Sequence, residues 1–222
     1  MDSFNSIYEF VSGPLVWIAF IIFIGGAVFK MYQMFSLVNK KEKFIYSYMS
    51  LRYSLRSIVH WAIPFATKNW RNRPVLTIVT FAFHFCLLIT PILLTAHVVL
   101  WQKAWHISWW MLPEFVADAM TLVVIFGGVV FLLRRLTFKE VKYLTTVSDY
   151  LLLAIVVTPF ITGFLAYHHW GNYRIMLILH MLSGEIMLMA IPFTRLSHMF
   201  FSFFTRAYIG SEFGNVRHAK DW

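Results

Sequence analysis

The sequence predicts an all-α integral membrane protein, a bundle of five transmembrane helices, and three observations support this. Hydrophobic residues make up 59% of its 222 residues. Charged residues make up only 13%, whereas a soluble domain carries about 25%. The apolar residues fall in blocks long enough to cross a bilayer, which takes roughly 20 residues per helix. We expect a single membrane domain over residues 1–222.

Five blocks meet this criterion, at about residues 14–36, 75–101, 114–133, 148–167 and 175–200. A sixth segment, about 44–73, mixes apolar and basic residues at roughly helical spacing, as in FIYSYMSLRYSLRSIVHWAIPF. This pattern predicts an amphipathic helix on the inner membrane surface, in contact with lipid. A docking surface for a cytoplasmic partner is the alternative interpretation, and His60 within the segment is expected to be an ordinary interfacial histidine.

The net charge of +9 comes from basic residues that gather in particular loops. They lie between blocks one and two, between blocks three and four, and after block five, whereas the other two loops hold only Lys103 and Arg174. This asymmetry is the positive-inside pattern of membrane proteins. It predicts an outside N-terminus and a cytoplasmic C-terminus, and it explains the charge without a nucleic-acid partner.

The fifth block carries two histidines, which are expensive in a bilayer and therefore point to a function. His180 and His198 lie 18 residues apart, or five turns of one helix. They are therefore expected to project from one face of the helix, about 27 Å apart along its axis. A single metal cannot use both, but two stacked sites could if another helix offers partners at similar depths.

Block two offers those partners, because His84 lies in its inner half and His97 near its outer end. The spacing predicts an outer pair of His97 with His180 and an inner pair of His84 with His198. Four histidines on two helices at two levels indicate a bis-histidine di-haem pathway for electrons across a membrane.

Two considerations weigh on this interpretation. On an ideal helix His97 points about 140° away from His84, so a kink or unwinding at Pro91 is needed to turn both toward block five. Alternatively, membrane histidines can simply hydrogen-bond between helices.

The cysteine content limits the kinds of cofactor that the chain can hold. The chain has one cysteine, Cys86, and no C-x-x-C-H motif, which excludes an iron–sulfur centre of its own and a covalently attached haem. Any haems are therefore b-type, held by axial ligands and packing. Arg195 stands one turn before His198 and is a candidate for a haem propionate or, equally, for lipid headgroups.

The LH-x(17)-H pattern of block five and its PFTRLSH ending resemble the cytochrome b subunit of membrane-bound nitrate reductase, the gamma-subunit family. The five spans, the outside N-terminus and the ligands on spans two and five match as well. In block two, the wide histidine spacing and the TPILLTAH run look more like cytochrome b subunits of transmembrane redox complexes of sulfate reducers. These are the high-molecular-weight cytochrome c complex and its relatives, and the HWAIPF and NWRNRP stretches are also similar.

The resemblance implies two b-type haems and menaquinone or a related quinone as substrate. It also implies a bacterial or archaeal cytoplasmic membrane, and a cytoplasmic iron–sulfur subunit, a periplasmic multihaem cytochrome, or both, as partners. Lys103 and Arg174 are further candidates for the propionates of the outer haem.

A quinone site needs a group that handles protons beside a haem. Glu185 is one candidate, an ionisable residue inside block five that lies roughly 140° from His180 around the helix. A second cluster is expected on the outer side, and an ordinary solvated turn is the alternative there. Its members are Glu114, Asp118, Tyr167, His168 and His169.

The function predicted from the sequence is electron transfer between the quinone pool and partner subunits of a respiratory complex. With so little mass outside the bilayer, the chain is not expected to be catalytic alone. Two alternatives remain: a small transporter or proton channel that uses the same histidines and Glu185, and a cofactor-free membrane anchor.

Overall fold

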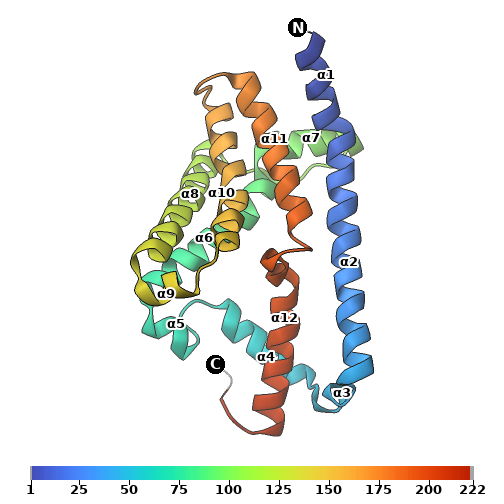
Figure 1. Ribbon diagram of the computed structural model, residues 1–222, viewed down its shortest axis with the longest axis vertical. Helices are drawn as coiled ribbons and strands as arrows, with labels where there is room; N and C mark the ends of the chain where they lie inside the picture. The colour runs from blue at the N-terminus through green and yellow to red at the C-terminus, as the bar shows by residue number, and fades with distance from the viewer. Residues whose placement is uncertain (1, 221–222) are drawn as a thin grey trace. The chain divides into compact units, whose positions relative to one another are not determined.

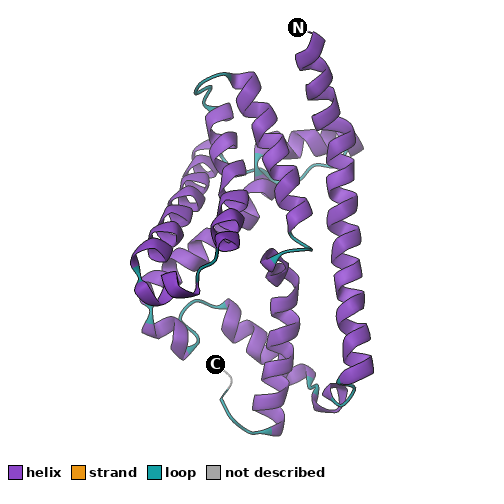
Figure 2. Cartoon of the chain, in the orientation of Figure 1, coloured by secondary structure: helices purple, strands orange, loops and turns teal. Residues whose placement is uncertain are grey.

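The computed structural model describes residues 2–220, and throughout this range the regular structure is helical, without strands (Figures 1 and 2). Within it, five helices are long and apolar enough to cross a membrane: Phe4–Lys41, Pro74–Leu93, Glu114–Thr137, Val147–Tyr167 and Tyr173–Ala190. The prediction of an all-α protein with five membrane-spanning helices is therefore confirmed.

The described chain forms two compact units. One unit comprises the N-terminal part up to Thr77 together with the part from Glu185 onward, and the other runs from Ile78 to Gly184. Both spans that carry the candidate histidines contribute to both units.

Span one is longer than predicted and contains one irregular turn. It consists of α1 (Asp2–Phe10), a π-helical turn η1 (Val11–Leu15) and α2 (Val16–Lys41). Pro14 lies inside η1, where its missing N–H disturbs the regular pattern of hydrogen bonds. Lys40 and Lys41 are the last two residues of α2, and their positive charge is favourable at the C-terminus of a helix.

The segment between spans one and two forms three short helices instead of one. They are α3 (Ile45–Tyr48), α4 (Leu51–Ala62) and α5 (Lys68–Asn72). The chain is extended at Ser50 and again at Ile63, the residue before Pro64, where a following proline disfavours the helical conformation. Thr67 then caps α5 by accepting a hydrogen bond from the backbone N–H of Trp70.

Span two is interrupted where the sequence allowed a kink. It comprises α6 (Pro74–Leu93) and α7 (Thr95–Trp105), separated by the extended residue Leu94. The three backbone carbonyls before Leu94 accept hydrogen bonds from His97 Nδ1, Trp109 Nε1 and the Leu112 N–H, at 2.7, 2.8 and 2.9 Å. The interruption is thus stabilised by internal partners, as a break inside a bilayer requires.

Spans three and four pack closely within the second unit. They are α8 (Glu114–Thr137) and α10 (Val147–Tyr167), joined through the short helix α9 (Lys139–Leu144). A Cβ atom at Gly128 of α8 would lie 2.6 Å from Val157 of α10. Only glycine permits this approach, which is a common feature of packed membrane helices; Figure 1 shows the two helices side by side.

Span five differs most from the sequence prediction, because a single helix over 175–200 is wrong. The structure has α11 (Tyr173–Ala190), a turn, the 3₁₀ turn η2 (Arg195–Ser197) and α12 (His198–Ile209), followed by the π-helix η3 (Gly210–Val216). Pro192 lies in the turn and cannot donate to a helical carbonyl. The Ala190 carbonyl instead accepts from the Phe193 N–H and the Thr194 hydroxyl.

The break has a direct consequence for the histidines of span five. His180 lies within α11, whereas His198 is the first residue of α12. The argument that both project from one face of one helix, five turns apart, therefore does not hold.

Candidate functional site

Two of the four candidate histidines come together in the second unit. His97, in the first turn of α7, faces His180, in the middle of α11. Their ring centroids are 6.0 Å apart and their ring planes are inclined by only 19°. The predicted outer pair is therefore present in the fold.

Each ring of this pair is held by a backbone carbonyl outside its own helical turn, 6 residues away for His97 and 21 residues away for His180. His97 Nδ1–H donates to the carbonyl of Pro91 across the break at Leu94, at 2.7 Å, and His180 Nδ1–H donates to the carbonyl of Pro159 on α10, at 2.8 Å. Because a carbonyl only accepts, both Nδ1 atoms carry a proton. The lone pair of each neutral ring is therefore on Nε2, the usual arrangement of metal-ligating histidines.

A glycine makes room for one of the two rings. A Cβ atom at Gly163 of α10 would lie 2.8 Å from His180 Nδ1 and 2.9 Å from its Cε1 atom. Real Cβ atoms do not approach other atoms so closely, so His180 can reach the Pro159 carbonyl only because residue 163 has no side chain. By contrast, a Cβ at Gly184, one turn after His180, would meet nothing within 4 Å.

The spacing of the pair fits a six-coordinate metal bound from two sides. Two imidazoles that bind one metal from opposite sides, at about 2 Å each, have ring centroids roughly 6 Å apart. The described residues contain no group of three or more histidine, cysteine or acidic side chains suited to a metal ion. A donor set of two histidines suits a haem, because the macrocycle brings its own four equatorial nitrogens.

The other two candidate histidines show a more ordinary pattern. His84 on α6 donates through Nδ1 to the carbonyl of Thr80, and His198 donates to the carbonyl of Arg195, both at 2.8 Å. His60 makes the same local bond to Arg56, at 2.9 Å. The local bond fixes the same tautomer, but it does not distinguish a ligand from any helical histidine. His84 and His198 belong to different units, and their pairing stays a prediction.

Glu185 on α11 is a buried carboxyl group inside a membrane-spanning helix. Its residue is only 5% exposed, and within residues 2–220 neither carboxyl oxygen has a hydrogen-bond partner. A charged carboxylate without partners is costly to bury, so Glu185 is an unusual residue for the interior of a membrane-spanning helix.

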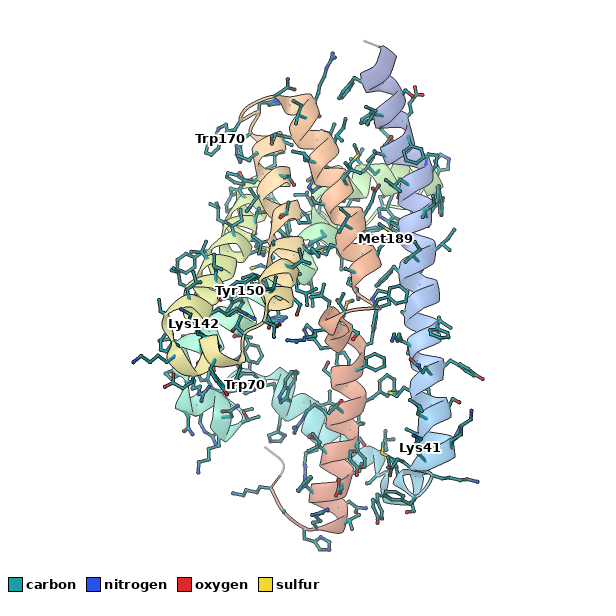
Figure 3. The ribbon with its side chains drawn as sticks, in the orientation of Figure 1. Lys41, Trp70, Lys142, Tyr150, Trp170 and Met189 are labelled. Carbon is teal, nitrogen blue, oxygen red and sulfur yellow. The ribbon has the colours of Figure 1, made fainter. Side chains whose placement is uncertain are left out.

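The outer polar residues form two pairs in the second unit, near the turn between α10 and α11 where Trp170 is labelled in Figure 3. His168 Nε2 lies 3.1 Å from Asp118 Oδ2, without the alignment of a directed hydrogen bond, and both side chains are about a third exposed (30% and 33%). Tyr167 hydrogen-bonds to Glu114. The remaining member of the predicted cluster, His169, instead lies against Tyr173, with ring centroids 4.9 Å apart and ring planes inclined by 38°.

The three basic propionate candidates lie on separate elements. Lys103 is in the last turn of α7, Arg174 is the second residue of α11, and Arg195 opens η2. Their positive charge suits the binding of a haem propionate, and this role remains a prediction.

Sequence reasoning missed the residues that hold the histidine rings. The carbonyls of Pro91 and Pro159 and the small size of Gly163 matter only once the chain is folded. Their single sequence signal is the presence of Pro91 in span two and Pro159 in span four, since a proline marks a place where helical hydrogen bonding is incomplete.

Comparison with known proteins gives one informative match. The chain is 34% identical over 214 residues to a protein of Nitratidesulfovibrio vulgaris (strain Hildenborough), and the match covers 95% of each chain. The description of that protein states no activity. No family model matches the chain.

Proposed function

The chain belongs to the same family as the protein of Nitratidesulfovibrio vulgaris, and we propose that it is a cytochrome b subunit with two b-type haems. In this proposal it passes electrons between a quinone pool, menaquinone or a related quinone, and partner subunits of a respiratory complex. A haem supplies reversible one-electron chemistry when it is bound.

The observation that carries the proposal is the geometry of His97 and His180. The two rings are nearly parallel, with centroids 6.0 Å apart, and both Nδ1 atoms donate to backbone carbonyls. Histidines that only link helices have no reason to lie ring to ring at this spacing while each is also fixed by a carbonyl outside its own helical turn. Both features are expected of two histidines that together would hold one haem.

For the second haem we propose His84 and His198 as ligands. Their Nδ1 atoms also donate to carbonyls, which leaves the lone pair of each neutral ring on Nε2. Arg195 opens the 3₁₀ turn η2 that leads into α12 and is suited to a propionate of this haem, while Lys103 and Arg174 are suited to the outer one. The inner and outer levels rest on the distribution of basic loops, which puts the N-terminus outside.

Protons are proposed to move through this chain's own carboxyl and imidazole groups. Quinol oxidation releases protons, so acceptors are needed near the site of electron transfer. Glu185 offers a buried carboxyl, and the Asp118–His168 pair offers an exposed one that exchanges with water. Tyr167, His169 and Glu114 belong to the same outer region.

The location and partners follow from the same proposal. The five apolar helices make this a multi-pass membrane protein, and the cytoplasmic membrane of a bacterium or archaeon is the proposed location. The proposed partners are a cytoplasmic iron–sulfur subunit, a periplasmic multihaem cytochrome, or both.

A proton channel or small transporter is the second candidate, and one observation favours it. Spans two and five are both interrupted, at Leu94 and over residues 191–197. Paired broken helices are typical of transporters, where they build the substrate site. A cofactor-free anchor has no comparable support, because it requires none of the histidine geometry.

Spectra of the purified chain separate these candidates. A reduced-minus-oxidised difference spectrum should show b-type haem, and extraction should give about two haems per chain, because four histidines form two ligand pairs. A folded preparation without haem would refute the cytochrome proposal and favour the channel.

Ligand variants then test the pairing. His97→Ala and His180→Ala should abolish the same spectral component, while His84→Ala and His198→Ala should abolish the other. His60→Ala is the matched control, since His60 makes the same type of local bond but lies outside the spans. Loss of one component in both His84→Ala and His180→Ala would show that the pairs are crossed.

A further inference from the structure

The amphipathic helix α4 buries its polar face and exposes its apolar face. Ser54 and Ser57 are buried, whereas Leu51, Leu55 and Val59 are 76%, 52% and 50% exposed. These three leucine and valine side chains follow one another at intervals of four residues and so form one stripe along the helix, called here the apolar stripe. A helix at a water-exposed surface would show the opposite arrangement.

The rotation of α4 about its axis is fixed by hydrogen bonds to α12 and η3 within the same unit. The Ser54 hydroxyl donates to the carbonyl of Ala207 at 3.1 Å and lies 2.9 Å from the Ser211 hydroxyl. Arg206 donates to the Ser57 hydroxyl at 2.6 Å. On a helix, Leu55 and Ser57 point about 160° apart, so these bonds turn the apolar stripe away from the protein.

Two glycines of η3 allow it to approach α4 so closely that α4 cannot rotate about its own axis. A Cβ atom at Gly210 would lie 2.5 Å from the Tyr53 carbonyl oxygen and 2.5 Å from Ser57 Cβ. A Cβ atom at Gly214 would lie 2.7 Å from the Tyr53 ring. The serine face and the bare backbone of η3 therefore form a close-packed, directional contact, and the exposure of the stripe is a fixed property of this unit.

The depth of α4 follows from its contacts with α12, which in turn packs on span one. The rings of Phe204 on α12 and Phe35 on α2 are in edge-to-face contact, with centroids 5.6 Å apart. Two residues after Phe204, Arg206 contacts α4. The sequence places the end of span one at about residue 36, next to Phe35, so the middle of α4 lies at the level where this helix leaves the hydrocarbon region.

The surroundings of α4 match the chemistry of a lipid surface. Residues 40–73 contain eight basic residues, Lys40, Lys41, Lys43, Arg52, Arg56, Lys68, Arg71 and Arg73, and one acidic residue, Glu42. Two tryptophans flank the end of α4, with the rings of Trp61 and Trp70 5.8 Å apart (Trp70 is labelled in Figure 3). Tryptophan is enriched at membrane interfaces, and clustered basic residues attract anionic headgroups.

We propose that α4 is an interfacial helix whose apolar stripe inserts among the acyl chains of the adjacent leaflet, with the exposed basic residues Arg52, Lys68, Arg71 and Arg73 at anionic lipid headgroups. The lipid is favoured over a soluble protein partner because α4 lies at the level of the end of a membrane span. An amphipathic helix in this position buries its apolar face about 5–10 Å into the headgroup and acyl boundary.

Spin labels on the full-length chain in lipid nanodiscs test the proposal. In a Cys86→Ala background, labels are placed at Leu55→Cys, at Ile21→Cys as the lipid-exposed reference and at Lys43→Cys as the water-exposed reference. Oxygen concentrates among acyl chains and a nickel chelate is excluded from them, so the ratio of their collision rates reports insertion. The ratio at Leu55 should approach that at Ile21 and exceed that at Lys43 several-fold.

Two results would overturn the proposal. A Leu55 label with the collision ratio of Lys43 would place the apolar stripe in water, as expected of a docking face for a soluble partner. A Leu55 ratio that is unchanged when phosphatidylglycerol is replaced by phosphatidylcholine would remove the role of the basic residues. Haem content enters neither measurement, so the outcome is independent of the proposed cytochrome function.

Discussion

Adding a single methyl group at Gly163 should disturb the proposed haem of His97 and His180 and leave the other proposed haem intact. The new Cβ of Gly163→Ala would lie 2.8 Å from His180 Nδ1, whereas ordinary van der Waals contact begins at 3.4 Å. The ring must therefore move by at least about 0.6 Å, the difference between these distances. That movement opposes the 2.8 Å hydrogen bond from His180 to the Pro159 carbonyl.

The size of the effect follows from two changes, the weakening of a hydrogen bond and the overpacking of a buried site. A hydrogen bond contributes about 0.5–1.5 kcal/mol, and overpacking of a buried site costs about 1–3 kcal/mol. Removal of the partner that orients a metal-ligating histidine typically lowers affinity about 10–100-fold. We therefore expect haem to bind about 10–100-fold more weakly at the site of His97 and His180, with a low-spin signal that is shifted or lost.

The assay is a haem titration of the purified apo-protein, followed by low-temperature electron paramagnetic resonance. Two control variants separate the ligand effect from general damage. Gly128→Ala introduces a similar clash, 2.6 Å from Val157 in the same unit, and should lower the melting temperature without changing either haem signal. Gly25→Ala adds a methyl group that meets nothing within 4 Å and should change neither property.

The reasoning would be refuted by Gly163→Ala protein that binds two haems with the parent affinity and unchanged spectra. It would equally be refuted if Gly128→Ala removed the same spectral component. In that case helix packing in the second unit, and not the position of the His180 ring, would control the outer haem.

Three further predictions concern other parts of the fold. Gly26→Ala should lower the free energy of unfolding by about 1–3 kcal/mol in a denaturant titration, because its Cβ would lie within 2.9 Å of Pro192 and Phe193. Glu185→Gln should leave both haem spectra intact and slow their reduction by a quinol analogue, since an amide cannot exchange a proton; an unchanged rate would end the proton-relay proposal. A hydrogen bond from the Tyr208 hydroxyl lowers the pKa of Glu212, so this carboxylate stabilises η3 above its ordinary pKa of 4.5. The contribution should be lost as the pH falls from that value through the lowered one, and Glu212→Gln should remove this acid dependence in pH-dependent melting curves.

The number of spans could be predicted from the sequence, because the length of an apolar block follows directly from bilayer thickness. The break within span five was not predicted, although its residues IPFTRLS include a proline and an arginine, and in span two the sequence predicted only that a kink or unwinding at Pro91 was needed. Proline alone does not mark a break: Pro159 lies inside an unbroken α10, whereas Pro192 lies in a turn.

Tertiary contacts decide which proline becomes a break. The turn at Pro192 packs on Gly26 of span one, where any side chain would collide with it. At Leu94 the freed carbonyls find Trp109 and Leu112, residues that follow α7 by several positions. Such partners cannot be read from the local sequence, since their distance from the break along the chain is set by the fold.

The candidate site, too, was predicted from the sequence only in part. The residue types and their approximate depth were sufficient to pair His97 with His180, and the structure brings these two rings together. The objection that His97 points about 140° from His84 assumed one continuous helix, and the extended residue Leu94 removes that assumption. The pairing of His84 with His198 rested on a continuous span five, so it needs independent support.

The breaks themselves help to choose between an electron carrier and a transporter. In a transporter, the unwound carbonyls of a broken span line a cavity and bind the substrate or its coupling ion. Here the three carbonyls of residues 91–93 accept from His97, Trp109 and Leu112, so their hydrogen bonds are made within the protein. One of these bonds fixes the tautomer and direction of a candidate haem ligand. A break that immobilises a histidine suits a centre whose geometry must stay constant while electrons pass, because a fixed ligand needs little rearrangement when its metal changes charge.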